Sequence, residues 1–334
     1  MSEVNEILSQ LTTEEKEKLR AKKVLITGGG GFLGSWIGET LLALDTKVYC
    51  LDNFSTGIRR NIESLKSNKN FRLIEGDVEN FETDESFDFV FHFASRPAPD
   101  DYVLHPVETL KANSIGTLKM LELSKKSNAT FVYASSSEVY GDAEVIPTPE
   151  DYWGKVNPIG VRSCYDEGKR FSEALCMAYF RECNLDVRIV RIFNTFGPRL
   201  RADGTYGRAI SRFLTQALGH QPITIYGDGQ QTRSFTYVTD TVTGILKVAT
   251  SGLAKGEVFN IGNTEETKII DLATLIIKLT ESKSKIIFLP PAKDDPRRRR
   301  PDITKAMLTL KWAPRVSIEE GIKRTIEWLK NQKI

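Results

Sequence analysis

Residues 23–34 of this chain have the sequence KVLITGGGGFLG. The first five, Lys23–Thr27, form a short β-rich run, and Gly28, Gly31 and Gly34 follow at three-residue intervals before a helical stretch begins. Glycines let the backbone turn tightly and approach a pyrophosphate group, and the N-terminus of the next helix favours an anion. Glycines are also common in turns that are merely flexible, but strand, glycine loop and helix in this order predict a dinucleotide-binding unit.

The next predicted strand supports this interpretation, because it ends in a carboxylate. Residues 47–51 form a second β-rich run that ends at Asp52, 18 residues after Gly34 (52 − 34 = 18). The fingerprint places a carboxylate on the adenosine ribose near this position. A negative charge there disfavours the extra phosphate of NADP, so we expect NAD. A third strand, followed by an acidic turn, is predicted over 71–78 and contains Asp77. Asp77 either contacts the adenine amine or is an ordinary turn residue.

Strands and helices continue to alternate beyond this point. Further strands are predicted at 87–93, 130–134 and 187–193, and helices at 106–127 and 164–182. Such alternation is typical of a doubly wound parallel sheet. We therefore predict an α/β fold, in which a Rossmann sheet carries a smaller α/β substrate-binding lobe at its C-terminal side.

The alternation then loosens, which indicates a domain boundary. We predict an N-terminal helical extension over 1–20 and a dinucleotide-binding domain over 21–193, to which 232–262 return. Residues 194–231 and 263–334 would form the substrate-binding lobe. The helices predicted in this part of the chain cover 206–218, 268–280 and 318–329.

The composition narrows the class of protein. The chain has 334 residues, of which 40% are hydrophobic and 27% charged, and a net charge of +2. These values fit a soluble globular protein without a general nucleic-acid or membrane-surface partner.

No apolar run approaches the length of a membrane span and no signal-peptide core is present, so we expect a cytoplasmic location. The chain has only three histidines and no CxxC pair, so we expect no metal site and no disulfides. The cysteines are Cys50, Cys164, Cys176 and Cys183.

A serine-rich segment follows the fifth predicted strand. Ser135, Ser136, Ser137 and Glu138 stand where that strand ends. In an open parallel sheet the carboxyl ends of the strands line the ligand crevice, so hydroxyls and a carboxylate at such an end are well placed for chemistry. Serine is also common in ordinary loops, but the preceding strand favours a functional site.

Tyr165 and Lys169 are four residues apart in a predicted helix, so their side chains lie on one face. A free tyrosine has a pKa of about 10 and is a poor base at neutral pH. A lysine ammonium one turn away favours the phenolate, and the pair could then accept a proton from a substrate hydroxyl. This spacing also arises by chance on many helices, and it gains weight here from the glycine loop and the serine-rich strand end.

Together these motifs resemble the extended short-chain dehydrogenase/reductase superfamily, in its nucleotide-sugar branch. The similarity extends from about Lys23 to the C-terminus. It rests on the glycine loop, Asp52-Asn53-Phe54, Gly76-Asp77-Val78, Ser135–Gly141 and Tyr165-x-x-x-Lys169. Within this branch the chain is most similar to UDP-glucuronate decarboxylases (UDP-xylose synthases). The segments that carry this narrower similarity are 150–160, 164–170, 191–199, 231–235, 294–296 and 299–302.

The resemblance implies a redox-neutral decarboxylation with tightly held NAD. Tyr165 would remove the proton from the hydroxyl on the fourth carbon of the sugar as hydride passes to NAD. Ser136 would bond the same oxygen, and Lys169 would contact the nicotinamide ribose. The resulting ketone is β to the carboxylate, so loss of carbon dioxide leaves an enolate that the ketone oxygen stabilises. Glu138 and Ser137 would handle the carboxylate or the replacing proton, and returning hydride gives UDP-xylose.

The resemblance also implies two sets of binding residues. For the cofactor they are Gly28, Gly31, Phe32, Leu33, Gly34, Asp52, Asn53, Phe54, Ser55, Thr56, Asp77, Val78, Phe93, Ala94, Ser95, Asn113, Ala134, Tyr165 and Lys169. For the UDP-sugar they are Asn194, Arg199, Tyr226, Arg233 and Arg299.

Three positions depart from the family pattern. Arg96 follows Ser95 where the family usually has proline, near the expected sugar pocket, so the exact sugar stays open. Ser136 stands where threonine is commoner, which keeps the hydroxyl. Ser137 stands where the related dTDP-glucose 4,6-dehydratases have an aspartate that acts as the acid for water loss, so dehydration is disfavoured.

Two other functions remain as alternatives. A UDP-sugar 4-epimerase would perform the same oxidation, but it needs no additional acid–base group such as Glu138. A non-catalytic NAD-binding regulator would not need the set of Ser136, Tyr165 and Lys169. The basic run 297–300 is either a solvated loop or a loop that presents an arginine to a phosphate.

The resemblance further implies a homodimer. Members of the superfamily commonly pair through the helices that correspond here to 106–127 and 164–182. Both predicted helices contain more apolar residues than one core-facing stripe needs, although all of them could belong to the core. The examples are Met120, Leu123, Met177 and Phe180.

We expect NAD to remain bound through purification, because the glycine loop and Asp52 form a complete fingerprint. Protein denatured after purification should release NAD into the supernatant, where chromatography identifies it. Release of NADP alone would overturn the argument from Asp52.

Overall fold

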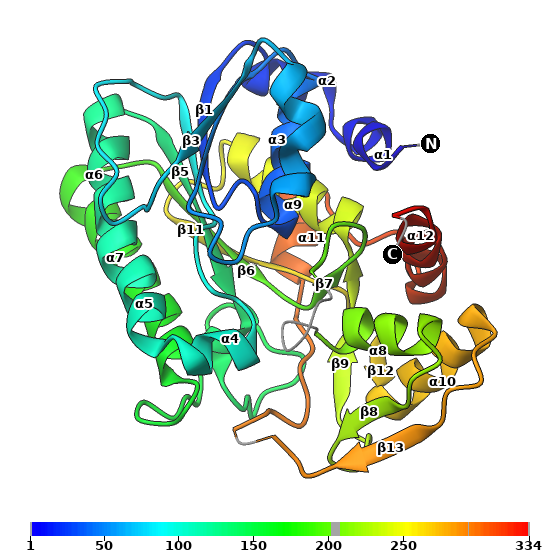
Figure 1. Ribbon diagram of the computed structural model, residues 1–334. Helices are drawn as coiled ribbons and strands as arrows, with labels where there is room; N and C mark the ends of the chain where they lie inside the picture. Colours follow the sequence, from blue (N-terminus) through cyan, green and yellow to red (C-terminus); the bar gives the residue numbers. More distant parts are fainter. Residues whose placement is uncertain (1, 202–207, 293, 333–334) are drawn as a thin grey trace.

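The computed structural model describes residues 2–201, 208–292 and 294–332, and its centre is a parallel β-sheet (Figure 1). The seven strands lie in the order β11-β6-β5-β4-β1-β2-β3. Their bounds are β1 Lys23–Thr27, β2 Lys47–Asp52, β3 Phe71–Glu75, β4 Phe89–His92, β5 Thr130–Ser136, β6 Val187–Ile192 and β11 Glu257–Ile261. Their Val-, Ile- and Phe-rich sequences suit a sheet that is covered on both faces. The predicted α/β fold is confirmed.

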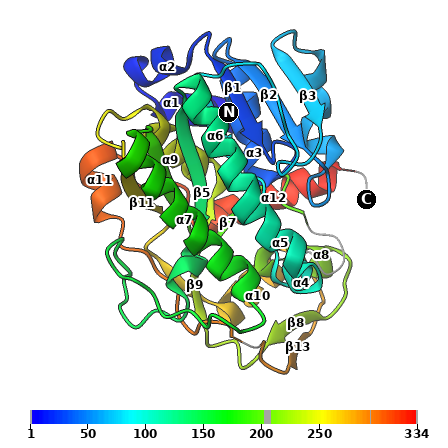
Figure 2. The same cartoon turned by 90° about the vertical axis from the view of Figure 1, so that its left-hand side faces the viewer.

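Helices cover both faces of this sheet (Figures 1 and 2). One face is covered by α3 (Phe32–Leu42) and α9 (Val238–Thr250), and the other by α5 (Pro106–Lys111), α6 (Thr117–Ser127) and α7 (Ser163–Cys183). Because β1 pairs with both β2 and β4, the connections diverge there, and a crevice opens at the carboxyl ends of these strands. Within the described ranges, no helix combines the length and apolar character that crossing a membrane would require.

The predicted helix over 106–127 is interrupted. A π-helical turn, Ala112–Gly116, joins α5 to α6. The carbonyl of Asn113 in this turn accepts hydrogen bonds from the hydroxyls of Thr117 and Ser172. The bond from Ser172, on the neighbouring helix α7, draws this carbonyl out of the regular helical ladder, and such bulges often occur at functional sites.

The apolar residues that we expected at a dimer surface belong to the core instead. Met120 and Leu123 are buried, and Met177 and Phe180 pack against the same cluster. Other large apolar side chains are exposed on α5, on α7, on the π-helical turn, on α6 and on the short helix α4 (Pro99–Leu104). They are Val103, Leu104, Val107, Leu110, Ile115, Leu118 and Phe171.

The C-terminal lobe is a smaller α/β unit beside the carboxyl edge of the sheet (Figure 1). Its strands β8 and β13 pair in parallel, and β9 and β12 pair antiparallel. The bounds are α8 Ala209–Leu218, β8 Ile223–Tyr226, β9 Thr232–Ser234, β12 Glu266–Lys268, α10 Ile269–Thr280 and β13 Ile286–Leu289. The start of the helix predicted at 206–218 lies outside the described residues.

The remaining elements connect the lobe to the rest of the chain. The short strands β7 (Thr195–Phe196) and β10 (Thr236–Tyr237) pair in parallel, and α11 (Thr304–Leu310) and α12 (Ile318–Asn331) end the chain. Strand β11, which lies within the segment 232–262, pairs with β6 of the main sheet. The boundaries between domains stay a prediction.

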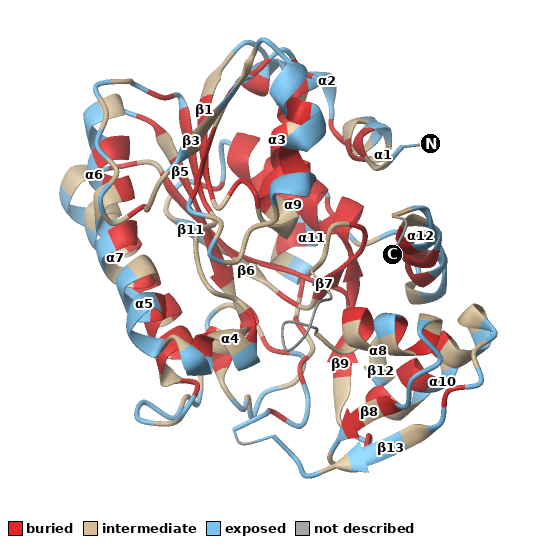
Figure 3. Cartoon of the chain, in the orientation of Figure 1, coloured by how far each residue is buried: buried red, intermediate tan, exposed pale blue. Residues whose placement is uncertain are grey.

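The N-terminal extension is part of the folded body. Helices α1 (Glu3–Gln10) and α2 (Thr13–Leu19) pack on α9, which is buried along its length (Figure 3). Glu15 closes a capping box with Thr12 at the start of α2 and also accepts hydrogen bonds of 3.0 and 3.1 Å from Lys247. The extension therefore packs over the helices that cover one face of the sheet.

We expect Ile7→Ala to lower the free energy of unfolding by about 2–5 kcal/mol, because the Ile7 side chain is fully buried in the main core. Urea denaturation measures this change. Asn5→Ala on the exposed face of the same helix is the control and should change stability by less than about 0.5 kcal/mol. Equal effects of the two substitutions would show that α1 is not part of the cooperative fold.

Candidate active site

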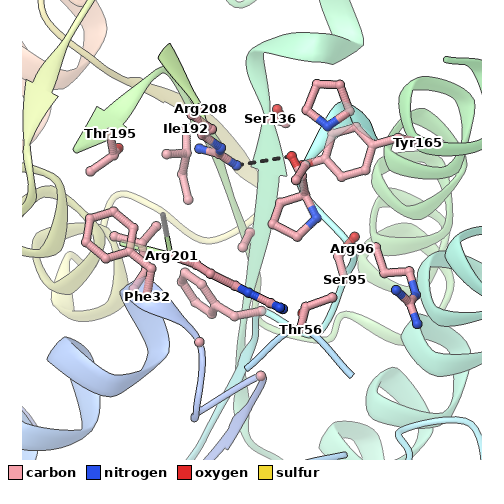
Figure 4. A pocket seen from close by; sticks show the side chains of 18 of the residues that line it. Phe32, Thr56, Ser95, Arg96, Ser136, Tyr165, Ile192, Thr195, Arg201 and Arg208 are labelled. Atoms are coloured by element: carbon pink, nitrogen blue, oxygen red, sulfur yellow. Dashed lines mark hydrogen bonds between the residues drawn. The ribbon is translucent and has the colours of Figure 1, made fainter. Parts of the chain in front are cut away.

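A cavity of about 470 Å³ lies between the carboxyl edge of the sheet and the lobe. The glycine loop, the end of β5 and the start of α7 line it from the sheet side, and α8, β8 and β9 line it from the lobe. Figure 4 shows Phe32 and Thr56 in one part of this cavity and Ser136 with Tyr165 in another. The dashed line from Arg208 marks its 3.2 Å hydrogen bond to the carbonyl of Pro97.

The glycine loop is tight enough that side chains would not fit. Gly28 has φ +70°, and a Cβ there would lie 2.8 Å from the carbonyl carbon of Phe93. A Cβ on Gly34 would collide with the carbonyl oxygen of Gly28. Gly31 is the N-cap of α3 and provides no side-chain cap, so the first N–H groups of the helix are available to an anion. This loop fits the phosphates of a dinucleotide.

Asp52 is held in place by the backbone. Its Oδ2 accepts a hydrogen bond of 2.8 Å from the N–H of Gly30, and its Oδ1 accepts one of 2.8 Å from the N–H of Phe54. Burial raises the pKa of this carboxyl, and the two N–H groups oppose the rise. Asp77 lies close by, because Asn53 donates a 3.0 Å hydrogen bond to it. Both aspartates line the cavity, as a site for an adenosine ribose and adenine requires.

Of the residues predicted to bind the cofactor, all but two line the cavity. Phe54 is not among the lining residues, and its ring lies under the guanidinium of Arg59 at 4.1 Å. Asn113 is buried in the π-helical turn and accepts a 3.1 Å hydrogen bond from the hydroxyl of Ser95. Asn113 therefore orients a lining residue without facing the cavity. The sequence could not reveal the contact of Phe54 with Arg59 or that of Asn113 with Ser95, because both depend on the folded structure.

Tyr165 and Lys169 lie on one face of α7, as the spacing predicts. Nζ of Lys169 is 5.6 Å from the centre of the Tyr165 ring and donates a 2.8 Å hydrogen bond to the carbonyl of Ala134. The expectation that Lys169 lowers the pKa of Tyr165 is not met here. Burial raises the pKa of Tyr165 to about 12, opposed by the charge of Arg208 and the hydroxyl of Ser136, and burial lowers the pKa of Lys169 to about 7.

A second tyrosine supports the first. The ring of Tyr102 stacks on that of Tyr165, with centroids 5.0 Å apart and planes inclined by 5°. Tyr102 is buried, and it lies behind Tyr165, outside the lining of the cavity. The stack restricts the Tyr165 ring to one orientation.

Glu138 lies between two arginines. Both carboxylate oxygens accept hydrogen bonds from Arg299, at 2.6 and 2.7 Å, and one also accepts a bond of 2.7 Å from Arg162. Burial raises the pKa of the Glu138 carboxyl, but the charges of Arg162 and Arg299 outweigh this effect and hold the pKa at about 2. Glu138 is therefore ionised at neutral pH. Ser137 is buried beside it and lines the cavity.

The five residues predicted to bind the UDP-sugar all line the cavity. Arg199 stacks on Trp36 at 3.7 Å and forms an ion pair with Glu39, so its charge is already balanced. Arg299 contacts Glu138, which places it at the serine-rich end of the site. The cavity thus has cationic side chains at both ends.

The sequence missed several lining residues. Arg162, Arg208, Arg212 and Asp295 face the same cavity. Arg162 stands three residues before Tyr165 and could have been noticed from that spacing. Asp295 lies in the segment 294–296 that carries the family resemblance but was not assigned to the site, and Arg208 and Arg212 carry no local signal. Arg96, the residue that departs from the family pattern, also lines the cavity and pairs with Asp101 at 2.8 Å. No cluster of metal-ligating side chains occurs among the described parts of the chain.

A Rossmann sheet with a glycine loop and a Ser–Tyr–Lys set defines the extended short-chain dehydrogenase/reductase class. The family model described as GDP-mannose 4,6 dehydratase matches residues 25–325, so the chain belongs to this family. The resemblance inferred from the motifs is confirmed.

Relatives and solved structures agree with this assignment. The chain is 48% identical over 314 residues to a UDP-glucuronic acid decarboxylase of Danio rerio, covering 93% of this chain and 73% of the relative. It is 45% identical over 311 residues to one from Arabidopsis thaliana, covering 91% and 68%. A UDP-glucuronic acid 4-epimerase from Bacillus cereus, solved with UDP-glucuronic acid and NAD, superimposes with TM-score 0.84 at 30% identity, covering 93% of this chain and 99% of that one.

We expect the stabilising effect of Glu138 to depend on pH. Its pKa in the folded protein, about 2, lies below the ordinary value of 4.5, so its contribution is complete above the ordinary value and is lost as pH falls from there toward 2. Glu138→Gln should lower the free energy of unfolding clearly near pH 6 and much less near pH 3, as measured by urea titration. Glu122→Gln, at an exposed site, is the control. A pH-independent effect of Glu138→Gln would contradict the ion-pair argument.

Proposed function

We propose that this protein is an NAD-dependent UDP-glucuronate decarboxylase, which converts UDP-glucuronate to UDP-xylose through a 4-keto intermediate. The observation that carries this proposal is the arrangement at the end of β5. Ser136 and Tyr165 line the cavity together with Glu138, whose carboxylate is bound by Arg162 and Arg299. Guanidinium groups that already bind one carboxylate are suited to a second, on a sugar acid. Similarity to several UDP-glucuronic acid decarboxylases supports the same reaction.

The residues present fit NAD. The glycine loop gives close approach for the pyrophosphate, and Asp52 is oriented by two backbone N–H groups toward the cavity that it lines. When bound, NAD supplies the acceptor that takes hydride from the sugar and later returns it. Lys169 and Tyr165, which line the same cavity, would hold the nicotinamide end.

The protein's own groups manage the proton of the sugar hydroxyl. Tyr165 is the base that receives it, and Ser136 is the neighbouring hydroxyl that bonds the same oxygen. Because burial raises the pKa of Tyr165 to about 12, proton transfer depends on cations that stabilise the phenolate. Arg208 supplies such a charge from the lobe, whereas burial lowers the pKa of Lys169 to about 7, so Lys169 carries only part of a positive charge at neutral pH. Tyr102 keeps the ring in place by stacking.

We assign to Glu138 the role of orienting the carboxylate of the sugar. The two arginines keep it ionised, so at neutral pH it has no proton to donate. Two carboxylates cannot share one small site unless positive charge separates them, and Arg162 and Arg299 provide this charge. Glu138 therefore holds these arginines in position for the sugar carboxylate, and Ser137 offers a hydroxyl beside them.

Incubation with UDP-glucuronate tests the function directly. We expect release of carbon dioxide and formation of UDP-xylose, without a net change in the redox state of the cofactor. Formation of UDP-galacturonate without carbon dioxide would make the protein a 4-epimerase, and absence of any product would favour a regulator.

We expect Tyr165→Phe and Glu138→Gln to fail at different steps. Tyr165→Phe lacks the base for oxidation, so neither NADH nor carbon dioxide should appear. Glu138→Gln should still bind UDP-glucuronate and reduce the cofactor, but carbon dioxide release should fall about a hundredfold, the cost typical of misplacing a reacting group. Single-turnover absorbance for NADH, followed alongside carbon dioxide, measures both. Tyr179→Phe, on the same helix, is the control. If Glu138→Gln turns over at the wild-type rate, Glu138 does not orient the sugar carboxylate.

We also propose that the protein is a cytoplasmic homodimer that needs neither nucleic acid nor membrane. The exposed apolar residues of α4, α5, the π-helical turn, α6 and α7 form the proposed contact face, since large apolar patches on a soluble protein usually mark interfaces. Light scattering at micromolar concentration should give twice the mass of one chain, 37.6 kDa. Val107→Glu combined with Leu110→Glu should shift the protein toward monomer. A wild-type monomer would refute the proposal.

A further inference from the structure

Five charged side chains form a continuous series of ion pairs along one wall of the cavity. Arg299 binds Glu138 at 2.6 Å, and Glu138 binds Arg162 at 2.7 Å. Arg162 then contacts Asp295 at 3.3 Å, and Asp295 binds Arg233 at 2.8 Å. The three arginine side chains are 7–9% exposed, whereas that of Asp295 is 33% exposed. The signs alternate along this series, and Asp166 adds a third carboxylate, 4.0 Å from Arg162.

Asp295 joins parts of the chain that are far apart in the sequence. Arg162 directly precedes α7, on the sheet side of the cavity, and Arg233 lies on β9 of the lobe. Asp295 uses Oδ1 for Arg162 and Oδ2 for Arg233. One carboxylate is thus divided between the two sides of the site.

The segment that carries Asp295 is attached to the lobe. The N–H of Thr232 donates to the carbonyl of Arg297, and the N–H of Ser234 donates to that of Arg299, at 3.0 and 3.3 Å. The same segment is also bound to Thr148, whose N–H donates to the carbonyl of Arg300 and whose carbonyl accepts from the N–H of Asp302. The ion pairs of Asp295 and Arg299 with Arg162 and Glu138 link this segment to the end of β5 and the start of α7.

We propose that Asp295 is a positioning residue that sets the distance between the two anion-binding ends of the site, and so favours a ligand that is negatively charged at both ends. The inference rests on the proposed function, in which UDP-glucuronate is such a ligand, with a diphosphate and a sugar carboxylate. In this proposal Arg233 binds the diphosphate, and Arg162 and Arg299 bind the sugar carboxylate.

Only a carboxylate can perform this role at position 295. Each of its oxygens accepts from a guanidinium, and the single negative charge is shared by two cations. An asparagine would turn an N–H₂ group toward one of the arginines, so that one of the two links would be replaced by a contact between donors. Asp295→Asn therefore removes the link with almost no change in size.

The test measures ligand affinity in a chain that cannot react. In a Tyr165→Phe background with bound NAD, calorimetry gives the dissociation constants of UDP, UDP-glucose and UDP-glucuronate. Adding Asp295→Asn should weaken UDP-glucuronate binding about tenfold or more, because the buried guanidinium groups of Arg162 and Arg233 would each lose a charged partner. UDP and UDP-glucose, which lack the carboxylate, should change by less than about threefold.

The exposed neighbour provides a matched control. Asp294→Asn makes the same chemical change at a residue for which the described structure shows no ion pair, and it should leave all three affinities unchanged. Equal weakening of all three ligands by Asp295→Asn would show that this residue acts on the nucleotide end alone, and no weakening would show that it has no positioning role. Either result overturns the proposal.

A conservative variant separates positioning from general stability. Asp295→Glu keeps the shared charge and should recover part of the affinity for UDP-glucuronate, whereas a variant that behaves like Asp295→Asn would count against the proposal. Melting temperature is followed in each variant. Carbon dioxide release by the wild-type chain tests the proposed function separately. A failure of the proposed function can therefore be distinguished from a failure of the role proposed for Asp295.

Discussion

The parallel pairing of β1 with β2 on one side and β4 on the other is the constraint on which the site depends. Parallel strands need long crossovers, and these crossovers diverge at β1, so their helices cannot close over the carboxyl ends of β1 and β4. The glycine loop after β1 and the serine-rich end of β5 consequently face one cavity. The lobe adds the second wall, because no strand end by itself could enclose a ligand of this size.

Charge within this cavity is balanced by pairing. Moving an ionised group out of water costs several kcal/mol unless a partner compensates for it. Glu138 meets this condition with two arginines, and Arg233 meets it with Asp295. The pairs of Glu138 with Arg299 and of Arg162 with Asp295 join residues 161 and 133 positions apart, so they also fix the lobe segment relative to the sheet.

The sequence by itself determined the local structures and which segments of the chain form the strands of a parallel sheet. Gly34 was identifiable because the backbone of Gly28, six residues earlier, leaves no room for a side chain, whereas the contact that restricts Gly28 comes from Phe93 on another strand. The runs of β-branched and aromatic residues predicted the strands, and the i, i+4 spacing placed Tyr165 and Lys169 on one face of α7. These features depend on nearest neighbours along the chain, which a single sequence records.

The tertiary structure alone decided which charges meet and how the tyrosine is tuned. The segment 294–296 contributes to the family resemblance, but the contacts of Asp295 depend on Arg162 and Arg233, from two other segments. Burial, which raises the pKa of Tyr165, is a property of the assembled cavity. Electrostatic energies depend on distance in space and on removal from water, neither of which is fixed by position along the chain. The sequence therefore specified the backbone and the reactive side chains, and folding decided their charges and partners.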